Sequence, residues 1–140
     1  MKNNKAKVLK MDDELFKFRR QIIGLLYEAR TVLGMELPRI KVRIVEYTDS
    51  TTLGTCWIDK DYITLAAKLS QESENTLRAV VWHELAHAYF KAPHVEGCPL
   101  MDATLDRSVT KAQLVKALKA LKPRKTKSKA YANLWEAMMQ

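Results

Sequence analysis

Residues 80–88, Val-Val-Trp-His-Glu-Leu-Ala-His-Ala, form the stretch from which the rest of the sequence can be interpreted. His83 and His87 are four residues apart, so on an α-helix both side chains lie on one face, with Glu84 beside them. Apolar side chains recur at helical spacing through and before this stretch, at Leu77, Val80, Val81, Leu85, Ala88 and Tyr89. The pattern predicts a partly buried helix that presents two imidazole rings and a carboxylate at one surface.

The His-Glu-x-x-His spacing is typical of a catalytic zinc site. Two imidazoles on one helix face can bind a single Zn²⁺ ion, and a site with three protein ligands keeps one position open for water. Such an ion lowers the pKa of that water to about 7, and Glu84 can then accept its proton for attack on a peptide carbonyl. We therefore predict a zinc-dependent metallopeptidase, acting as an endopeptidase, with Glu84 as the catalytic base. The alternative is two histidines that happen to lie four residues apart.

A third metal ligand is expected in the segment that follows this helix. The side chains there that can bind zinc are His94, Glu96, Cys98 and Asp102. His94 is the remaining histidine of the chain and follows Pro93, where the chain can turn back toward the metal. We predict His83, His87 and His94 as the zinc ligands. Cys98 is the alternative third ligand, although a small buried side chain is the commoner role of such a cysteine.

The sequence before the zinc motif predicts one helix and three strands. Apolar residues recur at spacings of three and four from Asp13 to Leu33, between a capping aspartate at position 12 or 13 and Gly34. Residues 39–46 alternate between apolar and mostly basic side chains, which is the pattern of a half-buried strand. Two more strands, at residues 52–58 and 62–66, flank a polar turn and predict a hairpin.

The sequence around and after the zinc motif predicts further helices. Capping residues at 70–75 open the motif helix, a loop follows at 92–106, and helices are expected at 110–121 and 129–139, on either side of a break at Pro123. This order predicts an α+β fold with a small, mostly antiparallel sheet. We expect the sheet to pack on the N-terminal helix and on the motif helix, with a helical C-terminal part.

The positive charge of the chain is concentrated near its C-terminus. The length of 140 residues favours one compact domain. Residues 1–106 carry 15 basic and 15 acidic side chains, whereas residues 107–140 carry nine basic side chains and one acidic side chain. We expect a catalytic domain at 1–106 and a basic helical segment at 107–140 that packs on it. The basic segment can bind nucleic acid or an acidic partner, or it can be a solvated helix face.

The composition excludes several other classes of protein. Apolar residues make up 47% and charged residues 29%, which is typical of a folded globular chain. No apolar run is long enough to span a membrane, residues 1–10 do not resemble a signal peptide, and the two cysteines are too few for a disulfide scaffold. We therefore expect a cytoplasmic monomer that does not associate with membranes.

The zinc motif and its surroundings resemble the zincin metallopeptidases, which implies a zincin-like fold. His83-Glu84-x-x-His87, followed by His94 and Cys98-Pro99-Leu100-Met101, is similar to the metzincin arrangement, in which a methionine turn, here at Met101, lies beneath the metal. Phe90 and Pro93 stand where metzincins have a glycine and their third histidine. A core methionine is the alternative for Met101.

The stretch from Thr52 to Asp102 also resembles the SprT-like and Spartan proteases. These have the same motif on a helix, a third histidine at a more variable position, and an upstream strand pair similar to residues 52–56 and 62–65. The resemblance implies a protease that acts on DNA-bound proteins. The basic C-terminal segment fits such a role.

The first strand of the predicted hairpin is our candidate for binding a peptide or protein substrate. An extended peptide can add as a strand at a sheet edge, and we predict that Gly54, Thr55, Cys56 and Trp57 form that edge. The alternative is that Gly54 marks a β-bulge. Two other functions stay open: a nucleic-acid-associated, SprT-like protein whose zinc site is structural or inactive, and an effector protease that cuts one particular protein. The intact Glu84 favours catalysis.

Overall fold

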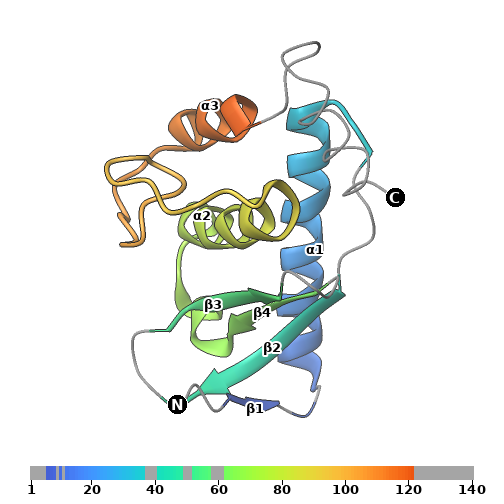
Figure 1. The fold of residues 1–140 in the computed structure, drawn as a ribbon. Coiled ribbons are helices and arrows are strands. Elements are labelled where there is room, and N and C mark those ends of the chain that lie inside the picture. Colours follow the sequence, from blue (N-terminus) through green and yellow to red (C-terminus); the bar gives the residue numbers. More distant parts are fainter. Residues whose placement is uncertain are drawn as a thin grey trace.

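The structure is a computed structural model that describes residues 6–8, 10, 12–36, 41–48, 52–57 and 62–121. Its elements in chain order are β1 (Ala6–Val8), α1 (Asp13–Leu33), β2 (Lys41–Tyr47), β3 (Gly54–Trp57), β4 (Tyr62–Ala66), η1 (Ala67–Gln71), α2 (Glu74–Leu85), η2 (Ala86–Phe90) and α3 (Lys111–Leu121). Figure 1 shows α2 between the sheet and α3, with α1 running alongside all of them. The predicted α+β class is confirmed, whereas β1 and the 3₁₀-helix η1 are elements that the sequence pattern did not indicate.

Helix α1 begins and ends where the sequence predicts, because both of its ends are capped. The Asp12 side chain accepts a hydrogen bond from the Leu15 backbone N–H at 2.9 Å. Gly34 follows the last turn with a φ of 65°, a left-handed conformation that favours glycine. The apolar face of the helix is buried at Phe18, Ile22, Leu25, Ala29 and Leu33. This face supports both α2 and α3.

The described strands form a mixed sheet in the order β1-β2-β4-β3. β1 pairs with β2 in antiparallel fashion, and the predicted β3–β4 hairpin is also antiparallel. The central strands β2 and β4 are parallel, with Lys41 opposite Tyr62, so the prediction of a mostly antiparallel sheet is wrong at the centre of the sheet. The central place of β4 agrees with its burial, because Ile63 and Leu65 on one face and Thr64 on the other are all buried.

Helix α2 carries the zinc motif through the core of the molecule. The Ser73 side chain caps its first turn by accepting a hydrogen bond from the Thr76 N–H at 3.1 Å. Trp82 is fully buried, and its Nε1 donates a hydrogen bond to the Leu25 carbonyl of α1 at 2.9 Å. The helix continues into η2, a π-helical turn that ends before Lys91. α2 is therefore held between α1 and the edge strand β3.

Helix α3 packs on the same core as the zinc-motif helix. Its Leu114 and Leu118 are fully buried, and it contacts both α1 and α2. The predicted break at Pro123 and the predicted helix at 129–139 lie outside the described residues. The division into segments 1–106 and 107–140 therefore stays a prediction. In the part of the chain that is described, no helix has the length and apolar character needed to cross a membrane.

Candidate metal centre

Three histidines converge at the C-terminal end of the zinc-motif helix. His83 lies in α2 and His87 lies in the π-helical turn η2, which continues the same helix. At Lys91 the backbone adopts a φ of 49°, and the chain leaves the helix there. It then brings His94 back, so that the His94 ring centroid lies 5.2 Å from that of His83 and 4.8 Å from that of His87.

The imidazole nitrogens of these residues point toward a common centre. His83 Nε2 lies 3.0 Å from His87 Nε2 and 3.3 Å from His94 Nε2. One ligand nitrogen from each ring lies within 4.8 Å of the other two. Two nitrogens that each lie about 2.0–2.1 Å from one tetrahedral zinc ion are about 3.3 Å apart. The observed spacing therefore fits three ligands of a shared metal ion.

Backbone carbonyls determine which nitrogen of each helix histidine faces this centre. His83 Nδ1 lies 2.7 Å from the Leu100 carbonyl oxygen, and His87 Nδ1 lies 2.7 Å from that of Ala92. A carbonyl oxygen only accepts hydrogen bonds, so each Nδ1 carries the proton, and each Nε2 of a neutral ring presents a lone pair. Two lone pairs that face each other at 3.0 Å repel unless a cation is shared between them. This arrangement is the one that metal-ligating histidines usually have.

Burial of the two helix histidines favours the form that binds metal. Desolvation lowers the pKa of His83 and the pKa of His87, because a charged imidazolium is disfavoured away from water. Both rings are consequently neutral at pH 7 and available as nitrogen donors. Imidazole nitrogens are ligands that suit first-row transition metals, zinc among them. The three histidines can therefore hold a metal ion.

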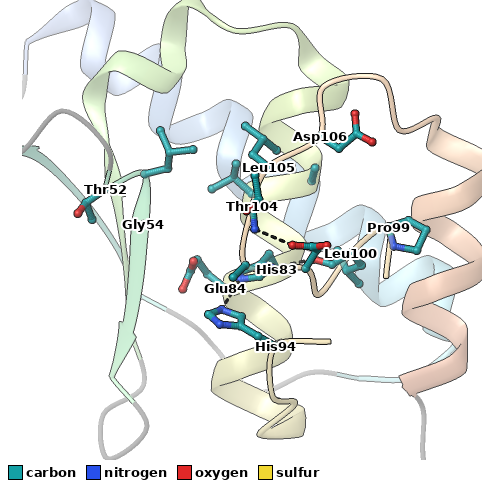
Figure 2. A pocket seen from close by; sticks show the side chains of 15 residues that line it. Thr52, Gly54, His83, Glu84, His94, Pro99, Leu100, Thr104, Leu105 and Asp106 are labelled. Carbon is teal, nitrogen blue, oxygen red and sulfur yellow. Dashed lines mark hydrogen bonds between the residues drawn. The ribbon is translucent and has the colours of Figure 1, made fainter. Parts of the chain in front are cut away.

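Glu84 lies next to this centre and is almost completely buried. Its side chain is only 7% exposed, and this burial raises the pKa of Glu84 to about 7. A carboxyl group whose pKa lies near neutral pH can both accept and return a proton efficiently. Figure 2 shows Glu84 beside His83 and His94, on the side of the helix that faces β3. A cation bound by the histidines would favour the charged carboxylate.

A cavity of about 230 Å³ lies over this group of residues. Gly54 at the start of β3 and the two residues before it line one side, and residues between 99 and 106, in the loop before α3, line the other (Figure 2). Ala79 and Val80 of α2 contribute apolar surface, while His83, Glu84 and His94 contribute the polar groups. The cavity thus brings an apolar surface and a buried carboxyl group to the same place as the three histidines.

Two of the other candidates for the third ligand, Cys98 and Asp102, form hydrogen bonds within the loop that follows the helix. Cys98 is half-buried, and its Sγ accepts a hydrogen bond from the Met101 N–H at 3.3 Å. The Asp102 carboxylate accepts hydrogen bonds from the N–H groups of Gly97 at 2.8 Å and Thr104 at 2.9 Å, and these lower the pKa of Asp102. Met101 itself is fully buried in the hydrophobic core. Within the described residues, the group with metal-ligand spacing consists of the three histidines.

The predicted substrate segment lies at the edge of the described sheet. Gly54, Thr55, Cys56 and Trp57 form β3, which pairs with β4 on one side and is the last strand in the order of the described sheet. Their register with β4 is continuous, one residue opposite one residue, so the alternative of a β-bulge at Gly54 is wrong. The structure therefore brings this edge and Glu84 together, because β3 contacts α2.

Sequence reasoning missed the backbone groups that complete the site. The carbonyls of Ala92 and Leu100 orient two imidazoles, and the loop between residues 99 and 106 forms one wall of the cavity. Every residue has a carbonyl group, so no residue type in the sequence could have identified these two. The sequence did single out Asp102, but as a possible metal ligand. In the structure its carboxylate instead accepts hydrogen bonds from the backbone of this loop.

A comparison with known protein families gives a match across much of this region. The SprT-like family matches residues 19–97, which is more than half of the chain and includes His83, His87 and His94. The match starts well before Thr52, where the resemblance was expected to begin, and takes in most of α1. No curated protein and no solved structure gave a significant match. Because the family match spans the zinc-motif helix together with the sheet and helix that support it, the chain belongs to the SprT-like family.

Proposed function

We propose that the protein is a zinc-dependent metallopeptidase that cleaves peptide bonds within protein substrates. His83, His87 and His94 hold the metal, and Glu84 is the catalytic base. Membership of the SprT-like family is consistent with this proposal. The observation that carries it is the position of a buried carboxyl group beside three converging imidazole nitrogens, at a cavity of the size of a side chain or short peptide segment.

The chemistry of the reaction can be divided between the metal and the chain. A zinc ion, when bound, supplies Lewis acidity toward a water molecule and toward the carbonyl oxygen of the substrate. Glu84 accepts a proton from the attacking water while the water oxygen forms a bond with the carbonyl carbon. Glu84 then gives the proton to the departing amine nitrogen as the carbon–nitrogen bond breaks. Burial alone raises the pKa of Glu84 to about 7, and a cation bound by the histidines would favour the carboxylate form that accepts the first proton.

We propose that the substrate binds in extended form along β3. Main-chain hydrogen bonds to a sheet edge would hold a peptide without requiring a particular sequence. Gly54 of this edge, together with Thr52 and Leu53 just before it, lines the same cavity as Glu84 and His94. A peptide added at β3 would therefore have its backbone close to Glu84 and His94. Holding the reacting groups together in this way lowers the entropic cost of the reaction.

The variant Glu84→Gln tests the proposed mechanism. Glutamine keeps the size of the side chain but cannot accept the proton, so we expect kcat to fall by about 10² to 10⁴-fold on an unfolded protein substrate. Metal content, measured by elemental analysis, should stay at about one zinc per chain. Glu74→Gln is the matched control, because Glu74 is an exposed residue at the other end of the same helix. Undiminished hydrolysis by Glu84→Gln would contradict the mechanism.

The alternative function predicts a different pattern in the same experiment. A nucleic-acid-associated protein with a structural or inactive metal site would bind zinc in the wild type and in both variants. It would hydrolyse neither unfolded proteins nor peptides in any of them. Hydrolysis that depends on both zinc and Glu84 supports the peptidase.

A further inference from the structure

Gly54 is packed more tightly than any other glycine in the described part of the chain. A Cβ atom added there would lie 3.1 Å from Glu84 Cγ, 3.1 Å from Leu65 Cδ2 and 3.2 Å from the Thr64 carbonyl oxygen. The positive-φ glycines are Gly34 and Gly97, so the backbone conformation of Gly54 does not itself require glycine. What favours glycine there is the close approach of the β3 backbone to Glu84 of α2 on one side and to Leu65 and Thr64 of β4 on the other.

The neighbour on one side of this contact is the proposed catalytic base. Glu84 is 7% exposed, and within the described residues no hydrogen bond or ion pair with another side chain accounts for its position. Packing therefore determines where its carboxyl group lies. The backbone of β3 at Gly54 forms part of that packing, because the Glu84 Cγ occupies the space that a side chain at position 54 would fill. Figure 2 shows Gly54 on β3 and Glu84 on the side of the neighbouring helix that faces this strand.

We propose that Gly54 is a positioning residue: by lacking a side chain, it allows the edge strand to lie against Glu84 and so fixes the carboxylate relative to both the metal centre and the substrate edge. This inference rests on the proposed function. As a consequence, β3 would determine two positions at once: that of the bound peptide, which it would hold, and that of the Glu84 side chain, which it contacts. The same strand would then fix the position of the scissile carbonyl relative to Glu84.

The variant Gly54→Ala tests this role, with Gly24→Ala as the matched control. Gly24 lies on the exposed side of α1 and has no heavy atom within 4 Å of its added Cβ position. We expect Gly54→Ala to lower kcat by about 10-fold with a smaller change in KM, because Glu84 Cγ must give way to the added Cβ and a displacement of about 1 Å can cost about 100-fold. Zinc content should not change. Gly24→Ala should keep the wild-type kcat.

A second variant separates positioning from simple strain. Adding Leu65→Val to Gly54→Ala removes the Cδ2 contact on one side but leaves the contact with Glu84 Cγ on the other. If Gly54 positions Glu84, kcat should stay low in the double variant, because the contact with Glu84 Cγ remains. Recovery of kcat together with stability would show that strain in β3 caused the loss, and would overturn the proposal.

Crystal structures of the zinc-loaded wild type and Gly54→Ala give a readout that does not depend on activity. We expect the Glu84 carboxylate to move away from β3 in the variant, while the three histidines keep their places. An unmoved carboxylate would overturn the positioning role. If the wild type binds zinc but hydrolyses nothing, the proposed function fails, and the carboxylate position alone then decides whether Gly54 positions Glu84.

Discussion

His94 differs from the other two histidines because it reaches the site from a loop. His83 and His87 are fixed by their helix and by carbonyl groups that accept from Nδ1. The position of His94 depends on the backbone turn at Lys91 and on the loop that follows it. Cys98, the alternative ligand from the sequence, instead accepts a hydrogen bond from the Met101 N–H.

Removing the His94 ring is therefore expected to release the metal without unfolding the protein. His94 is exposed, so His94→Ala leaves the core intact. We expect zinc affinity to fall by more than about 100-fold, beyond the loss typical of a residue that only orients a ligand. Competition with a chromophoric chelator measures this affinity, and circular dichroism checks the fold. Cys98→Ala is the control and should bind zinc as the wild type does. Loss of zinc in Cys98→Ala but not in His94→Ala would reverse the assignment.

Helices α1 and α2 are joined by a buried ion pair one turn before the zinc motif. The Arg78 guanidinium is almost fully buried and forms hydrogen bonds with Glu28 of α1 and, at 3.0 Å, with Asn75 Oδ1. It also lies 5.8 Å from the Trp82 ring centroid. Lys111 of α3 lies 3.5 Å from the same Glu28 carboxylate. One carboxylate thus links the three α-helices that support the metal centre.

Loss of the Glu28 charge should therefore destabilise the fold. Glu28→Gln removes the carboxylate that forms hydrogen bonds with the buried Arg78 guanidinium and leaves only the exposed Glu74 carboxylate, 3.9 Å away, as its counter-ion. We expect the free energy of unfolding to fall by about 1–3 kcal/mol. Urea unfolding at pH 7 measures this change. Glu36→Gln is the control, because Glu36 forms an exposed pair with Arg30 and should cost less than about 0.5 kcal/mol. Equal effects of the two variants would contradict the role given to Arg78.

The same ion pair predicts how stability depends on pH. The hydrogen bond from Arg78 is the main cause that lowers the pKa of Glu28 below its ordinary value of 4.5. Because the pKa is lower in the folded state, the ionised Glu28 contributes its full stabilisation at a pH above about 4.5. This contribution is lost as the pH falls below that value. The stability difference between wild type and Glu28→Gln should therefore shrink as the pH is lowered from 5 to 3. A difference that stays constant over this range would contradict the assignment.

The charges of the whole molecule are segregated along the chain. Basic and acidic side chains are equal in number in residues 1–106, and the excess of basic residues lies after residue 106. Within the described region, Lys111, Lys116 and Lys119 are exposed on α3, while Leu114 and Leu118 hold this helix to the core. The basic face is therefore on a helix that contacts both α2 and the turn η2, which carry the histidines. We propose that it binds nucleic acid through phosphate groups.

Reversing two of these charges tests that proposal in the full chain. Lys116→Glu combined with Lys119→Glu should weaken retention on DNA or RNA at about 50 mM salt and reduce the salt dependence of log K by about 2. Lys10→Glu combined with Lys17→Glu is the control, because it makes the same change in net charge at exposed residues that are distant from α3 in the sequence. Zinc content should not change in either variant.

Two outcomes would count against a nucleic-acid surface on α3. Equal losses in both double variants would mean that only net charge matters, and absence of any retention of the wild type would leave α3 as a solvated face. The remaining basic residues of the tail, including Lys122, Arg124, Lys125 and Lys127, lie outside the described residues. Their reversal to Glu, with the same readout, tests the rest of the predicted basic segment.

The sequence by itself determined the local features of this protein. Asp12 and Gly34 fixed the ends of α1, the alternation around Val42 and Ile44 indicated β2, and the spacing of His83 and His87 placed both rings on one helix face. Each of these depends on contacts between residues a few positions apart, or on the period of a single helix or strand. Such information is present in any short stretch of sequence.

Only the tertiary structure decided how these elements meet. The parallel pairing of β2 with β4, the approach of Gly54 to Glu84, and the carbonyls of Ala92 and Leu100 behind the histidines all join residues from separate segments or depend on backbone groups. The period of a strand shows which face is buried but not which strand lies beside it, and backbone atoms are the same in every residue. For that reason the sequence supplied the reactive side chains, whereas packing supplied their positions.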